Sequence, residues 1–211
     1  MDRRVLLGLS VAWLLCVAVV PAFQNPAGAA APVQVAIQTD AGDITLELYP
    51  DKAPATVGNF LSYVDQGLYN GAEFYRVLRL DNDRNPNSKV TYIQGGLNGK
   101  GKPLAPIAHE TTAQTGIKHT DGVISMIRQA PGTATSEFFI VIGDNPPFDH
   151  GGVRLPDGQG FAAFGRVVRG MEVVRTINGG EANGATPNPN VQGQYLTQPV
   201  KVLAMRRVAK G

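Results

Sequence analysis

The feature that most constrains the fold is a series of short segments, each of which places a polar side chain among apolar or β-favouring neighbours. In a strand, successive side chains point to opposite faces, so one set of residues can fill a core while the other faces outward. Five such segments occupy the middle half of the chain, at residues 74–76, 93–96, 122–126, 136–140 and 163–167. The chain is therefore expected to consist mainly of strands that present polar groups toward a groove.

The rest of the pattern predicts strands with two helices. Alternation and turn residues indicate strands at 33–38, 43–48, 73–80, 90–94, 123–128, 138–142, 162–168 and 200–208. Helical spacing of apolar residues indicates helices over 54–66 and 171–177, and a Gly-, Asn- and Pro-rich loop is expected over 179–199. Strands and helices do not alternate as in βαβ units, so an antiparallel barrel is favoured over a parallel sheet.

The first thirty residues have the layout of a cleavable export signal. Residues 1–4 carry net positive charge, and the apolar run at 5–20 is shorter than the roughly 20 residues that span a membrane. A cleavage pattern of small residues follows at 27–29. We therefore predict a signal peptide at 1–30 and one domain at 31–211, with an uncleaved membrane anchor as the alternative.

Composition argues against several kinds of protein. The formal net charge is +2, and Lys and Arg are scattered along the chain, so a nucleic-acid partner is not expected. The one cysteine, Cys16, lies in the apolar run of the predicted signal, so the mature chain is expected to have neither a disulfide nor a thiol catalyst. A mature length of about 180 residues suits one compact domain.

Four of the segments carry motifs in a fixed order: Phe-x-Arg at 74–76, Gln-Gly-Gly at 94–96, Ser-x-Phe-Phe-Ile at 136–140 and Phe-Gly-x-Val at 164–167. This series resembles the cyclophilin family of peptidyl-prolyl cis-trans isomerases, and in particular its bacterial exported branch, over about Val35 to Val208. The resemblance implies a mainly β fold, a closed eight-stranded antiparallel β-barrel capped by two α-helices. Because side chains fill the interior of such a barrel, the site is expected on its outer wall.

The resemblance also implies catalysis of rotation about X-Pro peptide bonds. This rotation faces a barrier of roughly 18–20 kcal/mol, although the two isomers at an X-Pro bond differ by only about 0.5–1 kcal/mol. A catalyst therefore needs a hydrogen-bond donor near the prolyl nitrogen and an apolar slot for the ring, with no nucleophile, metal or cofactor. Arginine suits the donor role because its guanidinium stays charged and presents several N–H groups in a rigid plane.

The family pattern assigns roles to individual residues. Arg76 stands at the position of the catalytic arginine, and Gln94 at that of the glutamine that binds the substrate backbone and supports the arginine. The contacts with the proline ring fall on Phe139 and Phe148. Further substrate contacts are implied at Tyr92, Glu137, Ile127, Arg128 and Phe161. Each residue also has an alternative role that is purely structural. Arg76 would be paired on a solvated face of the barrel, and Gln94 would be an amide that satisfies backbone groups at a strand end. Phe139 and Phe148 would be ordinary aromatic residues of the core.

The chain departs from the commonest family pattern within the implied site. Thr91 and Tyr92 replace Phe-Met, which predicts a wider or more polar slot. Glu137 replaces a glutamine, and a carboxylate there is expected to pair with Arg76, either orienting the arginine or competing with substrate for it. Phe161 replaces the histidine of many eukaryotic members, which implies weak binding of cyclosporin.

Two polar, turn-rich segments are expected to form surface loops near the site. The first, at 81–89, is an insertion relative to the shortest family pattern, and the second lies at 151–160. Each is either a rim or lid of the site or a loop without a functional role.

Two other functions compete with catalysis of isomerisation. A cyclophilin-like binding module would grip proline segments with little or no turnover; Thr91, Glu137 and Phe161 support this alternative, whereas Arg76 and Gln94 argue against it.

A hydrolase triad can be composed from three histidines with Ser136 and an aspartate. No Gly-x-Ser-x-Gly elbow surrounds Ser136, and the histidines lack the spacing of a zinc site. His119 and His150 adjoin turn residues, so both are expected on surface loops.

Export and isomerase activity together suggest a role in folding other exported proteins, because proline isomerisation takes tens of seconds and limits folding. The expected partners are proline-containing unfolded polypeptides, and the expected location is the periplasm, with secretion as the alternative. The mature protein is expected to be a monomer that does not contact a membrane.

Overall fold

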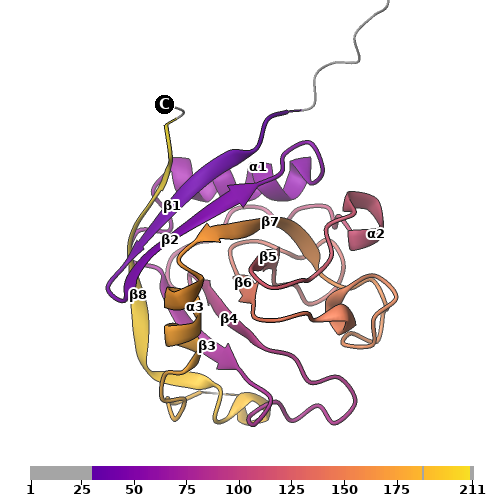
Figure 1. Cartoon of the computed structure of the whole chain (residues 1–211), viewed down its shortest axis with the longest axis vertical. Helices are drawn as coiled ribbons and strands as arrows, with labels where there is room; N and C mark the ends of the chain where they lie inside the picture. The colour runs from indigo at the N-terminus through magenta and orange to yellow at the C-terminus, as the bar shows by residue number, and fades with distance from the viewer. Residues whose placement is uncertain (1–29, 187, 210–211) are drawn as a thin grey trace, which may run out of the picture.

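Eight antiparallel strands close into a barrel, as predicted, in the order β1-β2-β7-β5-β6-β4-β3-β8 (Figure 1). The computed structural model describes residues 30–186 and 188–209, so the predicted signal peptide lies outside the described residues. The strands are β1 (Val33–Thr39), β2 (Gly42–Leu48), β3 (Glu73–Leu78), β4 (Tyr92–Gly96), β5 (Val123–Met126), β6 (Phe138–Val141), β7 (Ala162–Arg169) and β8 (Tyr195–Arg207). Pairing of β8 with β1 completes the circle.

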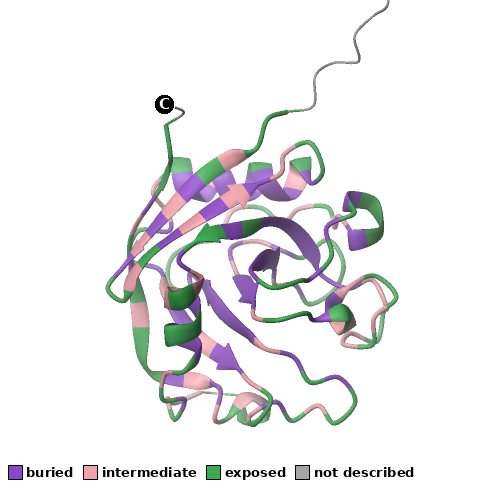
Figure 2. Cartoon of the chain, viewed as in Figure 1, coloured by how far each residue is buried: buried purple, intermediate pink, exposed green. Residues whose placement is uncertain are grey.

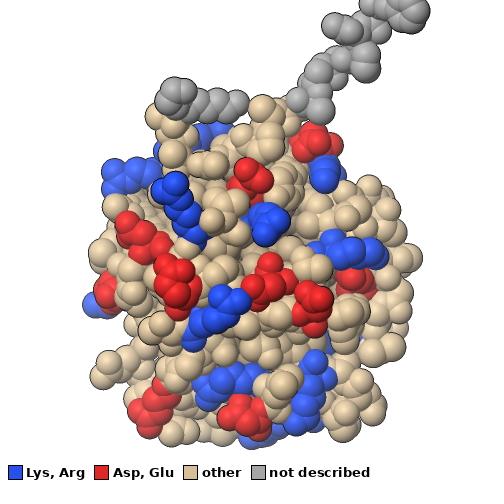
Figure 3. Space-filling view, viewed as in Figure 1, with Lys and Arg blue, Asp and Glu red and all other residues tan. Residues whose placement is uncertain are grey.

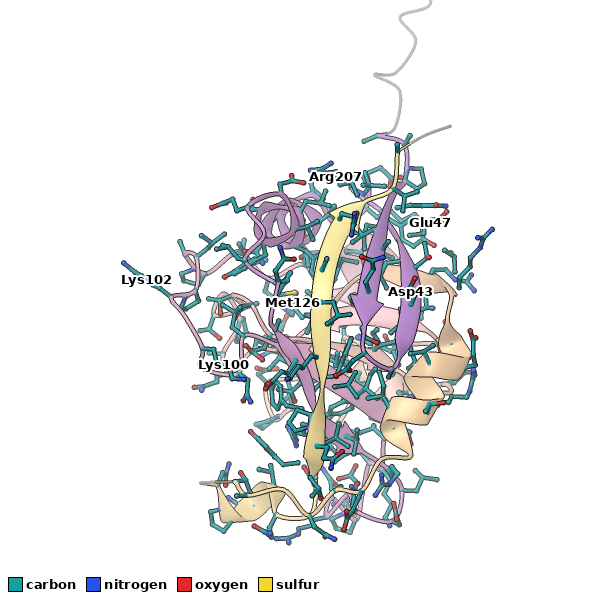
Figure 4. All side chains as sticks on the ribbon, turned by 90° about the vertical axis from the view of Figure 1, so that its left-hand side faces the viewer. Asp43, Glu47, Lys100, Lys102, Met126 and Arg207 are labelled. Carbon is teal, nitrogen blue, oxygen red and sulfur yellow. The ribbon has the colours of Figure 1, made fainter. Side chains whose placement is uncertain are left out.

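Two helices, α1 (Pro54–Asp65) and α3 (Met171–Asn178), lie on opposite sides of the barrel in both Figure 1 and Figure 4. Their positions agree with the predicted helices to within one residue at each end. Pro54 stands in the first turn of α1, where its missing N–H leaves no hydrogen bond unmade. Apolar side chains of both helices, among them Phe60 and Ile177, join the barrel core.

Three shorter elements have no apolar periodicity and were not predicted. A single turn, α2 (Thr112–Thr115), is closed by a capping box in which Thr111 and Gln114 bond to each other's backbone N–H. Two 3-10 helices, η1 (Pro146–Phe148) and η2 (Pro189–Val191), begin with proline. Elements this short present too few positions for a repeat to be visible in sequence.

Alternation along the strands divides the apolar side chains into two clusters. On β6, Phe138 and Ile140 point into the barrel core, whereas Phe139 and Val141 point into a second cluster on the outer wall. Both faces of β4, β5 and β6 are therefore buried, and Figure 2 shows these strands as continuous buried ribbons. The outer cluster forms an apolar floor on the barrel wall.

The last strand begins five residues earlier than predicted. Its first residue, Tyr195, pairs with Arg76 of β3, beyond a shift of register. The predicted loop at 179–199 is therefore too long, because pairing with a strand distant in sequence gives the end of this segment an extended conformation that its composition does not favour.

Charged groups of both signs are interspersed over the face shown in Figure 3. Of the helices in residues 30–186 and 188–209, none is long and apolar enough to cross a membrane.

Candidate active site

The Phe-x-Arg motif lies at a β-bulge in β3. Phe74 pairs with Gly95 of β4, and Arg76 pairs with the preceding residue, Gln94, so Tyr75 is an extra residue in the ladder. Phe74 and Val77 both fill the barrel core. The bulge turns the two intervening side chains to the outer side, where both hydrogen-bond to Gln94.

The guanidinium of Arg76 is held from two sides by glutamines. Its Nη1 donates to Oε1 of Gln94 at 3.1 Å, while its Nε and Nη2 donate to Oε1 of Gln194 at 3.1 and 2.6 Å. The group also lies over the ring of Tyr92, with Cζ 5.8 Å from the centroid. A guanidinium has five N–H groups. Three of them are used in these hydrogen bonds. The other two, one on each Nη, have no partner among the described residues and remain for a ligand.

The direct pair expected between Glu137 and Arg76 does not form, and that prediction was wrong. Oε2 of Glu137 accepts a hydrogen bond from the hydroxyl of Tyr75 at 2.6 Å, and that hydroxyl accepts from Nε2 of Gln94 at 2.5 Å. Oε1 of Glu137 accepts from the backbone N–H of Asn98. The carboxylate therefore reaches Arg76 only through Tyr75 and Gln94. Burial and the charge of Glu137 raise the pKa of Tyr75 far above its usual value, so the hydroxyl stays protonated.

The two glycines after Gln94 leave room for the groups that surround this network. A Cβ on Gly96, whose φ is +144°, would lie 2.6 Å from Oε2 of Glu137. A Cβ on Gly95 would lie 2.8 Å from the ring of Phe74 inside the barrel. The Gln-Gly-Gly motif thus admits a carboxylate on one face and an aromatic ring on the other.

A pocket of about 200 Å³ lies beside Arg76 on the outer wall. It is lined by Arg76, Tyr92, Ile127, Arg128, Phe139, Phe148, Arg154, Leu155 and Phe161. Seven of these were predicted from the sequence, whereas Arg154 and Leu155 were missed because they lie in the 151–160 loop, whose path no local pattern reveals. The other two predicted residues do not line the pocket: Gln94 bonds to Arg76, and Glu137 bonds to Tyr75. Four larger hollows, of about 320, 600, 400 and 430 Å³, contain none of the predicted residues.

Aromatic rings form the floor of the pocket. The ring of Phe139, at 0% exposure, has its centroid 5.1 Å from that of Phe148 and 5.2 Å from those of Phe161 and Tyr92. The Phe148 and Phe161 rings meet edge to face. These tilted and edge-to-face contacts are the favoured geometries for aromatic pairs, so the rings stabilise one another's positions.

His119 packs against two rings of the pocket floor, Phe139 and Phe148. Its predicted position on a surface loop was wrong. It is 1% exposed and stacks on Phe139, with 6.0 Å between centroids. Its Nδ1 donates to Oδ1 of Asp149 at 2.8 Å, and its Nε2 accepts from the hydroxyl of Ser125 at 3.0 Å. Burial lowers the pKa of His119, in agreement with a neutral ring. Ser125 is 0% exposed, so this Ser-His-Asp chain is closed to a substrate.

Arg128 shapes one wall of the pocket with a guanidinium that is fully engaged. Its nitrogens donate to both carboxylate oxygens of Asp157, at 2.7 and 2.9 Å, and to the carbonyl oxygens of Gly160 and Gln129. These contacts use all five N–H groups. The hydrogen bonds from Arg128 lower the pKa of Asp157 to about 2, so the pair persists in mild acid. The side chain therefore fixes the 151–160 loop and offers a substrate no N–H.

Arg154 joins the two polar loops. Its Nη1 donates to Oδ2 of Asp83 at 2.8 Å and to the carbonyl oxygen of Ser88 at 2.7 Å, and the side chain of Asp83 is 2% exposed. Since Arg154 also lines the pocket, the ion pair ties the 81–89 insertion to the pocket wall.

The described residues contain no group of three or more His, Cys, Asp or Glu side chains that could hold a metal ion.

This chain is similar to known proteins in both sequence and fold. The family model for cyclophilin type peptidyl-prolyl cis-trans isomerase/CLD matches residues 34–202. Peptidyl-prolyl cis-trans isomerase A of Dickeya dadantii is 36% identical over 208 residues, which cover 96% of this chain and 99% of that protein. Peptidyl-prolyl cis-trans isomerase B of Escherichia coli is 41% identical over 150 residues, covering 69% of this chain and 84% of that protein.

A solved structure agrees at the level of the fold. The crystal structure of a cyclophilin type peptidyl-prolyl cis-trans isomerase from Cryptosporidium parvum matches with a TM-score of 0.60 and 19% identity, covering 85% of this chain and 99% of that one. The barrel, the four ordered motifs and the relatives lead to one assignment. The chain belongs to the cyclophilin-type family of peptidyl-prolyl cis-trans isomerases.

Proposed function

We propose that Arg76 is the catalytic group of this isomerase and that the 200 Å³ pocket binds the proline ring of the substrate. One observation carries the proposal: a guanidinium held from two sides lines an aromatic pocket and keeps two N–H groups for a ligand. The N–H groups of Arg128 are all engaged, and the guanidinium of Arg154 is held in an ion pair with Asp83.

The reaction needs no bond to be broken and no proton to be transferred. The proline ring packs against Tyr92, Phe139, Phe148 and Phe161, and an Nη–H of Arg76 donates to the prolyl nitrogen as that nitrogen becomes pyramidal. In the planar amide the nitrogen lone pair is delocalised into the carbonyl and accepts poorly. The hydrogen bond is therefore stronger in the twisted transition state than in the ground state, which lowers the barrier.

Gln94 supports this arrangement in the proposal. Its Oε1 fixes Nη1 of Arg76, its Nε2 is fixed by Tyr75, and a second N–H on Nε2 remains for a substrate carbonyl. Ile127, which is half-buried, supplies the apolar side of the groove that follows the substrate backbone.

Replacing Arg76 by alanine tests the proposal. The expected result is loss of most of the acceleration of cis-to-trans conversion in an Ala-Pro peptide, measured by NMR exchange, with the circular dichroism spectrum of the folded barrel retained. Arg169→Ala is the control, because Arg169 is exposed on β7 and lies outside the pocket. A Cryptosporidium parvum cyclophilin has been crystallised in the presence of the dipeptide ala-pro, which supports the choice of probe.

An active Arg76→Ala variant would refute the role of Arg76. A wild-type protein that binds the peptide without accelerating its conversion would instead favour the binding-module alternative. Because Glu137 bonds to Tyr75 and Asn98 and not to Arg76, it does not compete with a substrate for the arginine, which weakens its support for that alternative.

We also propose that the protein is exported with cleavage of residues 1–30, and that it works in the periplasm as a monomer on unfolded proline-containing clients. The charge and apolar pattern of the first thirty residues supports this proposal. Cell fractionation with N-terminal sequencing tests it: an intact Met1 on cytoplasmic protein would contradict it. Sedimentation tests the monomer, and acceleration of a proline-limited refolding reaction tests the role in folding.

A further inference from the structure

Gln194, which precedes β8 and belongs to none of the four motifs, is the second support of Arg76. It is 3% exposed. Its Oε1 accepts from Nε and Nη2 of Arg76, and its Nε2 donates to the carbonyl oxygen of Asn82 at 3.1 Å. A buried amide is expected to have its polar atoms satisfied. Here one end of the amide is bonded to the proposed catalytic arginine and the other to the 81–89 insertion.

The first part of the insertion is bound at Asn82 and Arg84 to the segment that carries Gln194. Nδ2 of Asn82 donates to the carbonyl oxygen of Gly193 at 3.0 Å. Arg84 donates from Nη1 to the carbonyl oxygen of Pro189 at 3.0 Å and from Nη2 to that of Gln192 at 3.1 Å. Figure 1 shows the insertion after β3 running beside the segment that leads into β8. The insertion thus supports the segment behind Arg76.

The two glutamines hold different parts of the guanidinium. Gln94 binds Nη1 alone, and a planar group held at one nitrogen can still turn about that contact. Gln194 binds the edge formed by Nε and Nη2, which fixes the plane. Because Gln194 is neutral, it does not compensate the charge of Arg76, and the two free N–H groups remain strong donors.

We propose that Gln194 is a positioning residue for Arg76 and that the 81–89 insertion holds Gln194 in place. The proposal rests on the proposed catalytic role of Arg76. It assigns the insertion a support function behind the arginine, distinct from both alternatives considered from the sequence.

The test is Gln194→Met, which keeps the length of the side chain and removes its hydrogen bonds. We expect kcat for an Ala-Pro peptide to fall about tenfold, with KM within about twofold, because ring binding is kept while the arginine loses its orientation. In the wild type we expect the bond to Gln194 to protect the Arg76 Nε–H from exchange with water, and in the variant its NMR signal should lose that protection. Gln192→Met is the control, since Gln192 is exposed and its side chain bonds to none of the residues that the structure describes.

The outcomes separate this inference from the function on which it rests. If Arg76→Ala is active, the catalytic assignment fails. If Arg76→Ala is inactive but Gln194→Met keeps both kcat and the protected Nε–H, the assignment stands and the positioning role is overturned. A rise in KM without loss of Nε–H protection also overturns it. Should Gln194→Met not fold, Gln194→Asn, which is too short to reach Arg76, gives the same measurement.

Discussion

Replacing Tyr75 by phenylalanine removes a single oxygen atom from the centre of the network around Arg76. The hydroxyl donates to Glu137 at 2.6 Å and accepts from Gln94 at 2.5 Å. Together with Gln94, it links the carboxylate of Glu137 to the arginine. The aromatic ring, which packs 5.5 Å from the ring of Tyr195, is unchanged by the substitution.

The size of the effect follows from what is left without a partner. Gln94 is 6% exposed, so its Nε2 loses a buried acceptor, which costs about 1–3 kcal/mol. Glu137 keeps its hydrogen bond from the backbone N–H of Asn98. Because Glu137 is half-buried, water can replace part of the hydrogen bond that it loses from the Tyr75 hydroxyl. We therefore expect the free energy of unfolding to fall by about 2 kcal/mol, equivalent to a fall of about 4–8 °C in Tm for a chain of this size.

Urea denaturation with an unchanged m-value measures this loss, and the Ala-Pro assay should show a several-fold lower kcat because Gln94 is released. Tyr195→Phe is the matched control, since Tyr195 shares the ring contact and its hydroxyl is in no side-chain hydrogen bond among the described residues. A Tyr75→Phe variant within about 0.5 kcal/mol of the wild type would refute the bridging role of the hydroxyl.

Three further changes test other parts of the structure. Burial lowers the folded-state pKa of His119 below the unfolded value of about 6.5, so the unfolded chain binds more protons than the folded chain. The free energy of unfolding should therefore fall as the pH drops below about 6.5. His119→Gln should reduce this dependence on pH, measured by urea denaturation at a series of pH values. Asp83→Asn breaks the buried pair with Arg154 and should lower the free energy of unfolding by about 3 kcal/mol. Gly160→Ala places a Cβ against the carbonyl oxygen of Phe148 and should cost about 3 kcal/mol, measured by thermal unfolding.

Each of these changes has a control in the same chain. His150 is exposed, so His150→Gln should leave the pH slope as it is. The side chain of Asp81 is 75% exposed, and Asp81→Asn should be nearly neutral. Gly158 has the same φ of +63° as Gly160 but open space around its Cβ, so Gly158→Ala should cost only about 1–2 kcal/mol. Equal effects of the two glycine changes would contradict a steric origin.

The sequence predicted most of the barrel because its strands are short and alternate clearly. Phe138 and Phe139 illustrate this: neighbours in a strand must face opposite sides, and one lies in the barrel core while the other lines the pocket. The pattern could not show the bulge at Tyr75, which places two consecutive residues on the outer side, because a bulge depends on how the partner strand is paired.

Pairing over long distances in the chain also explains what was missed around the site. Gln194 lies 118 residues from Arg76, in a segment whose composition indicated a loop, and Arg154 meets Asp83 across 71 residues. No local property of these residues signals such contacts. The buried position of His119 was missed for the same reason, since its neighbours in sequence are turn residues whereas its neighbours in space are Phe139 and Asp149.

The sequence by itself determined the family, the barrel and seven of the side chains that line the pocket, because motif order and alternation are local properties. Only the tertiary structure decided which groups hold Arg76. A direct ion pair with Glu137 was chemically reasonable, but the bulge brings the Tyr75 hydroxyl into a chain of hydrogen bonds from Glu137 through Gln94 to Arg76. Closure of the barrel brings Gln194 to the guanidinium as its second partner. Hydrogen-bond partners are set by positions in space to within a few tenths of an ångström, which spacing along the chain cannot specify.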